Sequence, residues 1–166
     1  MENFSEVYGK LQETQAYKSF RQEHSDYTLA HGFVQLDANE KPSKPWHIGF
    51  YSPKKDDLAI FTSPDFALSF DKAFKDGGKI NELKVLPGFQ PTQEVLAGVK
   101  DHLQKNYPVE KPFTYLIILQ MIDGNPRYNI TIVTQAFKML NFQVDPLTAT
   151  IVQEKVQSVM DLKAEE

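Results

Sequence analysis

The chain has 166 residues, enough for one domain with its own core or for two small units that share one. Its hydrophobic fraction of 41% and charged fraction of 24% are typical of folded domains and exclude a largely disordered chain. The net charge of −4 argues against a nucleic-acid partner, because such binders usually present a basic face to phosphate. The absence of cysteine excludes disulfides, thiolate nucleophiles and cysteine-ligated zinc.

The ends and the hydropathy of the chain bear on its location. Met1 is followed by polar and acidic residues, whereas a secretory signal peptide has a basic end and then an apolar run. No stretch reaches the roughly 20 apolar residues that cross a bilayer. The sequence therefore predicts a cytoplasmic protein with no membrane partner, the alternative being that a leader has been removed.

The N-terminal third is predicted to begin with a helix and to continue as strands. Apolar residues recur at helical spacing over residues 4–24, with either a bend or a partly exposed stretch around residues 13–15. Alternation of period two then predicts a strand over residues 27–36. A polar loop over residues 37–45 follows, and residues 46–62 predict a hairpin with a turn rich in proline and aspartate.

A second helix is predicted to start at Ser63. Ser63 suits the cap, Pro64 suits the first helical position, and Gly77-Gly78 would end the helix. Its apolar stripe consists of Phe66, Phe70, Ala73 and Phe74. Residues 79–89 predict an irregular connection, and a third helix is predicted over residues 91–107.

The C-terminal third is predicted to form consecutive antiparallel strands. Residues 112–122, 128–134 and 137–152 are rich in β-branched and aromatic residues and are separated by Asp-Gly and Asp-Pro turn signals. Asp145-Pro146 also suits the start of a helix, but the β-branched residues that follow favour a strand, with a short helix from Glu154 to Leu162. The sequence thus predicts an α+β fold, in which three or four helices cover one face of an antiparallel sheet within a single compact domain of residues 1–166.

The two halves of the chain have a similar order of elements. Trp46-His47-Ile48, for example, is matched by Tyr128-Asn129-Ile130 after a comparable helix, strand and turn. Two interpretations stay open: a duplicated unit, with halves 1–78 and 79–166, or a chance similarity between two meanders.

A segment near the C-terminus resembles a known family. The predicted helix with small residues Ala97 and Gly98, followed by strands that end in residues 144–152, is similar to the PepSY family of helix-plus-sheet modules over residues 91–153. In that family the last hairpin usually has glycine where this chain has Ala149, a residue that accepts a left-handed turn poorly. The resemblance implies a non-enzymatic inhibitory, chaperoning or ligand-binding role beside peptidases or at cell envelopes.

The sequence shows no catalytic cluster at productive spacing, and so predicts a protein that is not an enzyme and that has no cofactor and no metal. None of the four histidines has metal-ligand spacing, and no nucleophile elbow or phosphate-binding loop is present. The alternative is an enzyme whose site is assembled from scattered residues such as His31, His47 and Asp56.

The preferred function is therefore a binding or interaction module. Aromatic side chains on a half-exposed sheet bind a protein, a peptide or a small apolar ligand at low entropic cost. The candidate binding residues are Trp46, Phe50, Tyr51, His31 and His47. The alternative is that Trp46 and Phe50 belong to the core, and a third hypothesis is a homo-oligomer joined through exposed sheet edges.

Overall fold

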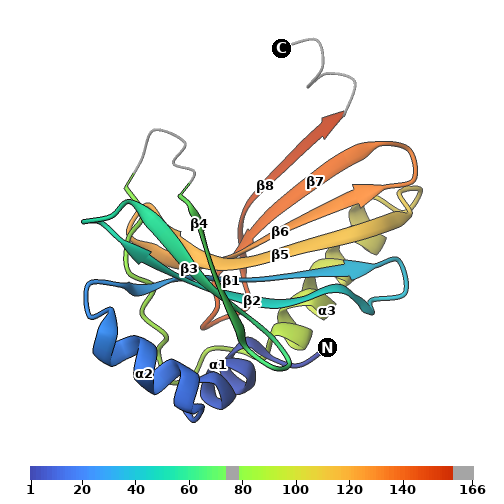
Figure 1. Ribbon diagram of the computed structural model, residues 1–166. Coiled ribbons are helices and arrows are strands. Elements are labelled where there is room, and N and C mark those ends of the chain that lie inside the picture. Colours follow the sequence, from blue (N-terminus) through green and yellow to red (C-terminus); the bar gives the residue numbers. More distant parts are fainter. Residues whose placement is uncertain (74–78, 159–166) are drawn as a thin grey trace.

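The computed structural model describes residues 1–73 and 79–158 of the chain. In this part an eight-stranded sheet has the order β4-β3-β2-β1-β5-β6-β7-β8, with every neighbouring pair antiparallel (Figure 1). The strands are β1 (Thr28–Asp37), β2 (Pro42–Ser52), β3 (Asp57–Thr62), β4 (Ala67–Lys72), β5 (Pro112–Ile122), β6 (Asn125–Thr134), β7 (Lys138–Val144) and β8 (Ile151–Ser158). The helices are α1 (Phe4–Gln12), α2 (Gln15–Glu23) and α3 (Thr92–Asn106).

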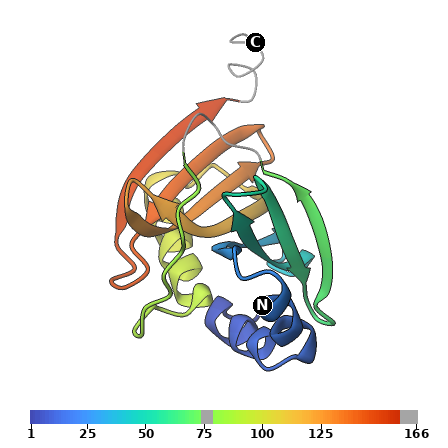
Figure 2. The ribbon, with the colours of Figure 1, turned by 60° about the vertical axis from the view of Figure 1, so that its left-hand side comes forward.

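All three helices lie on the same face of the sheet (Figures 1 and 2). From α1, the ring of Phe4 packs 5.6 Å from Trp46 on β2, and from α2 the ring of Phe20 packs 5.5 Å from Phe50. On the other half of the sheet, His102 of α3 lies 5.7 Å from the ring of Phe142. The predicted α+β fold, an antiparallel sheet covered on one face by helices, is confirmed.

Strand alternation separates a core face from an open face. Side chains that point toward the helices are almost fully buried, as period two requires of a sheet covered on one side. They include Val34, Leu36, Ile48, Phe61, Ile117, Leu119, Ile130 and Leu140. The opposite face, which we call the open face, carries half-buried residues from the same strands, among them Phe33, His47, Ile60 and Ile118.

The order of elements repeats along the chain. A helical segment and a four-strand meander, α1–α2 with β1–β4, are followed by α3 with β5–β8. The two meanders join through β1 and β5, which pair from His31↔Gln120 to Asp37↔Thr114. Trp46 and Tyr128 occupy the second strand of their meanders and both are buried. A common origin of the two halves stays a prediction.

The predicted helix from Ser63 is wrong where the structure describes it, because β4 pairs there with β3. Phe66 and Phe70 fit a helical stripe, but Phe66, Leu68 and Phe70 also fit the period of a strand, so the local pattern is compatible with both. Leu68 lies opposite Phe61, so pairing with a strand already in place outweighs the local helix signals. Residues 74–78 of this prediction lie outside the described residues.

The bend offered as one alternative around residues 13–15 is present, whereas two other boundaries differ from the prediction. The first helix is divided at Thr14, whose hydroxyl accepts a hydrogen bond from the Tyr17 N–H and so caps α2. The helix predicted from Glu154 to Leu162 is wrong as far as residue 158, because β8 pairs with β7 throughout, and residues 159–162 lie outside the described part. The loop predicted over residues 37–45 is shorter, since β2 begins at Pro42.

The turn between β7 and β8 forms as the hairpin interpretation predicts. Asp145 Oδ1 accepts from the Leu147 N–H at 2.8 Å, and the Asp145 N–H donates to the Thr150 carbonyl at 2.9 Å. Ala149 adopts a left-handed conformation with φ of 59° despite its Cβ.

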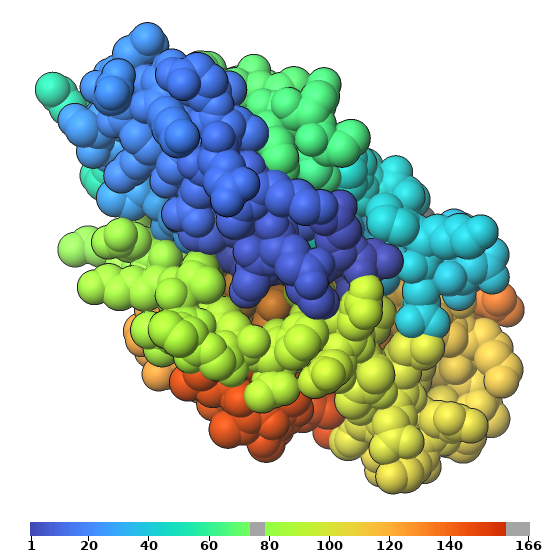
Figure 3. Space-filling model, turned by 90° about the horizontal axis from the view of Figure 1, so that it is seen from below, coloured from blue at the N-terminus to red at the C-terminus, as the bar shows by residue number. Residues whose placement is uncertain are grey.

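Residues 79–91 connect the two halves along the junction between them (Figure 2). The Leu83 N–H donates to the Leu29 carbonyl at 2.7 Å, just ahead of the point where β1 begins to pair with β5. Farther along, the Gln90 N–H donates to the Pro146 carbonyl at 2.6 Å. On the helix-covered face this segment lies between α1 and the β7–β8 turn (Figure 3).

Candidate ligand-binding site

Three of the five candidate binding residues are not available to a ligand. Trp46 is 3% exposed, and its indole N–H donates to the Glu2 carbonyl at 2.8 Å. Phe50 is 1% exposed among the rings of α2, so both residues belong to the core, as the alternative interpretation has it. Tyr51 is also buried, and its hydroxyl donates to Asp56 Oδ1 at 2.5 Å.

The other two candidates, His31 and His47, come together on the open face. They line a pocket of about 430 Å³. The other lining residues are Ala30, Phe33, Leu58, Ile60, Ile80, Ile118 and Gln120. The walls are therefore mainly hydrocarbon, and three polar side chains lie among them.

The strand register explains why these residues meet. His31 lies opposite Gly49 on β2 and Gln120 on β5, and in the next row Phe33 lies opposite His47 and Ile118. Between Leu29 and His31 the register with β2 shifts, so Leu29 points into the core while Ala30 and His31 both line the pocket. This β-bulge is a local irregularity that simple alternation of residues did not predict.

Gly49 makes room for the imidazole of His31. A Cβ placed on Gly49 would lie 2.2 Å from His31 Cε1, far inside van der Waals contact. Only glycine lets the ring lie directly over the neighbouring strand, which is one reason for a glycine within a strand.

Burial keeps His31 uncharged. Desolvation, with a smaller contribution from His47, lowers the pKa of His31 from 6.5 to about 4. A neutral imidazole has one N–H donor and one acceptor nitrogen. Within residues 1–73 and 79–158 no protein group forms a hydrogen bond with this ring, so both nitrogens are free for a ligand.

Two other hydrogen-bonding side chains, those of His47 and Gln120, lie beside His31. His47 Nδ1 donates to the Pro45 carbonyl at 2.7 Å, which leaves Nε2 as an acceptor in the neutral ring. The side-chain amide of Gln120 supplies both donors and an acceptor. An uncharged, mainly apolar molecule with a polar group fits such a pocket better than an ion does.

The described residues do not assemble the alternative enzymatic site. Asp56 lies in the turn between β2 and β3, accepts from Tyr51, and does not line the pocket with the two histidines. No group of three histidine, aspartate or glutamate side chains suited to a metal ion occurs in the part of the chain that the structure describes.

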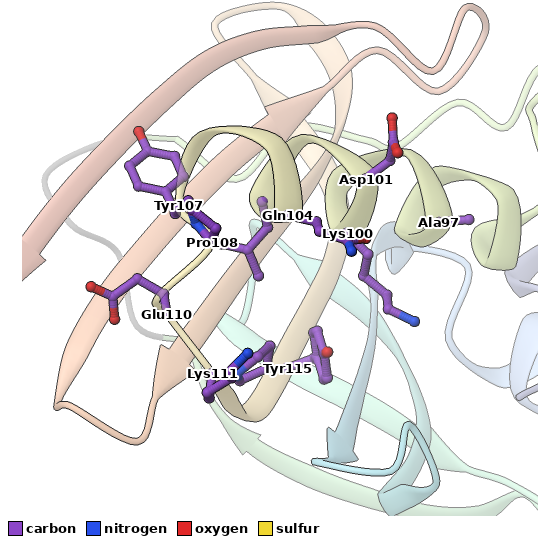
Figure 4. A pocket seen from close by; sticks show the side chains of 11 residues that line it. Ala97, Lys100, Asp101, Gln104, Tyr107, Pro108, Glu110, Lys111 and Tyr115 are labelled. Atoms are coloured by element: carbon purple, nitrogen blue, oxygen red, sulfur yellow. The ribbon is translucent and has the colours of Figure 1, made fainter.

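A second hollow, of about 440 Å³, lies between α3 and the start of β5 (Figure 4). Four of its polar side chains have a partner within the protein, and Glu110 points away from Tyr115. These pairs are Lys100 with Glu40, Asp101 with Lys105, Glu110 with Lys138, and Tyr107 with Glu154. Lys111, the Tyr115 hydroxyl and Glu110 Oε2 have no partner among the described residues, so this hollow presents charged groups where the open-face pocket is mainly apolar.

The sequence indicated only part of the site. Phe33 shares strand parity with His31, and Gly49 is a glycine in mid-strand, so both carried a usable signal. Ile118 and Gln120 reach the site only through the pairing of β5 with β1, which no local pattern encodes.

Comparisons with known proteins bear on the fold alone. No family model matches the chain, and no curated protein matches it. A crystal structure described as a putative lipoprotein from Clostridium difficile 630 superposes with a TM-score of 0.55 at 14% identity, covering 95% of this chain and 100% of that chain. In the described residues, no helix combines the length and the apolar character that crossing a membrane requires.

Proposed function

We propose that this protein is a non-catalytic binding module whose ligand occupies the open-face pocket. The observation that supports this most directly is the neutral imidazole of His31, set in apolar walls with its nitrogens unpaired by the described residues. Because the His31 nitrogens line the pocket and have no protein partner in the described residues, a ligand carrying one hydroxyl, amide or similar group would form a hydrogen bond with them.

The chemistry of the pocket favours binding over catalysis. A general base works best with a pKa near the working pH, whereas burial lowers the pKa of His31 to about 4. The resemblance of residues 91–153 to PepSY modules supports a role without turnover. The cytoplasmic location and the absence of a nucleic-acid partner stay predictions.

Indole, an apolar ring with one N–H donor, is a suitable first probe. We expect titration with indole to shift backbone amide resonances in β1, β3 and β5 around the pocket. The variant Ile118→Asn changes a lining residue and should abolish these shifts. The control Leu116→Asn changes a half-buried residue on the same face of β5 that does not line the pocket, and should retain them.

The proposal is wrong if both variants bind indole equally well, or if the shifts map to another part of the molecule. Catalytic turnover that is lost in the variant His31→Ala would also contradict a non-catalytic role.

A further inference from the structure

Uncharged polar side chains continue the open face from the pocket into the C-terminal half. The row that contains Phe33 and Ile118 continues to Asn129 and Gln143. The next row runs from Gln35 through Leu116 to Thr131 and Asn141. We call Asn129, Thr131, Asn141 and Gln143 the amide strip; it lies on β6 and β7, beside the pocket.

Hydrogen bonds within the amide strip fix the orientation of its side chains. Asn141 Nδ2 donates to Asn129 Oδ1 at 2.6 Å and to Thr131 Oγ1 at 2.9 Å. These bonds engage the donors of Asn141 but leave its Oδ1, and the Nδ2 of Asn129, without a protein partner in the described residues. Asn129 thus offers a donor and Asn141 an acceptor, and the Gln143 amide, which has no partner in the described residues, adds both; a peptide group offers the complementary pair.

The charge of this surface limits what can cover it. The strip itself is uncharged, and the nearest cationic neighbours in register are Arg127, opposite Gln120, and Lys155, opposite Asn141. A purely apolar ligand spread over the strip would leave its amides desolvated and unpaired, which is unfavourable. A ligand with its own amides would pair with them.

We propose that the pocket and the amide strip together bind an extended peptide segment, with one apolar side chain in the pocket and the adjoining main chain across β5, β6 and β7. This inference rests on the proposed function of the pocket. Three inter-strand spacings separate β1 from β7, or about 14 Å, which about four to five extended residues span. The anchor supplies apolar burial, and the strip supplies main-chain hydrogen bonds, as in other modes of extended-peptide recognition.

The test compares two blocked peptides with indole by amide chemical shifts. The anchored probe is acetyl-Phe-Ser-Gly-Ser-Gly-amide, and its matched control replaces Phe with Gly. The anchored peptide should shift amides of both the pocket and the strip, whereas indole should shift those of the pocket alone. The control peptide should bind far more weakly than the anchored one.

Two substitutions locate the contribution of the strip. Asn141→Leu keeps a similar size but removes the network, and should weaken the anchored peptide by about five-fold, the usual effect of one lost hydrogen bond, without changing indole binding. Gln22→Leu on α2, which lies on the opposite, helix-covered side of the sheet, is the control and should change neither. Should Asn141→Leu not fold, Asn129→Thr tests the same network.

Distinct results separate the two proposals. If indole binds the pocket but the anchored peptide shifts no strip residue, or Asn141→Leu leaves its affinity unchanged, the peptide proposal fails and the pocket proposal stands. If indole does not bind, the pocket proposal fails. Maltotriose, which offers hydroxyls without an apolar anchor, should not bind; strip shifts with this sugar and none with the peptide would overturn the inference.

Discussion

Replacing Gly49 with alanine tests the close approach on which the pocket depends. The new Cβ would lie 2.2, 2.7 and 2.8 Å from three ring atoms of His31, whereas ordinary contacts are about 3.5–4.0 Å. The ring must therefore move by about 1 Å or more, and overpacking of this kind costs about 1–3 kcal/mol. Alanine recovers about 0.5–1 kcal/mol of the conformational entropy that glycine loses in a strand. We expect Gly49→Ala to lower the free energy of unfolding by about 0.5–2 kcal/mol.

Urea unfolding of a double-mutant cycle isolates this contact. In the background His31→Ala the clash is absent, so Gly49→Ala should stabilise the protein by about 0.5–1 kcal/mol. Gly98→Ala in α3 is the control, because an added Cβ there meets nothing within 4 Å and the change should stabilise the helix. An equal effect of Gly49→Ala with and without the imidazole would refute the argument.

Two further predictions concern stability. Because burial lowers the pKa of His31 from 6.5 to about 4, the unfolded chain binds a proton in this range that the folded chain does not. The contribution of His31 to the free energy of unfolding is therefore complete above pH 6.5. It is lost as the pH falls toward 4, by up to about 3 kcal/mol. Urea midpoints across this range should fall more steeply for the wild type than for His31→Asn, and parallel curves would contradict the assignment. Ala149→Gly relieves the strain of a left-handed φ of 59° and should raise the free energy of unfolding by about 0.5–1 kcal/mol. The control Ala16→Gly, within α2, should lower it by a similar amount. A loss of stability at both positions would show that the turn is not strained.

The sequence predicted the fold well wherever one face of a strand is buried. In β1, β5 and β6 the alternation of apolar residues reports directly on the core, so their strand character follows from composition and period. The two edge strands lack this signal. β4 is exposed along its whole length and β8 along most of it, so neither alternates in burial, and pairing with a neighbour decides their conformation.

The residues of the open-face pocket were harder to predict from the sequence, because they too depend on which strands pair. Two strand histidines could be brought together by assuming that their strands are neighbours, and the structure confirms that both line one pocket. Trp46 and Phe50, the aromatic residues that looked most suited to binding, are buried in the core instead. Alternation along a strand does not show which face of the sheet the helices cover. Gln120 comes from the second half of the chain, and its place depends on the pairing of β1 with β5.

The bond between Leu83 and Leu29 gives the junction of the two halves a natural reporter. Ahead of His31, β1 is bonded to this passing segment and not to β5, so the Leu83–Leu29 bond can open while the seven residue pairs between β1 and β5 stay intact. The exchange rate of a single amide proton, that of Leu83, thus measures how often the connecting segment detaches from β1. A ligand that contacts Ile80 of the same segment in the open-face pocket should slow that exchange.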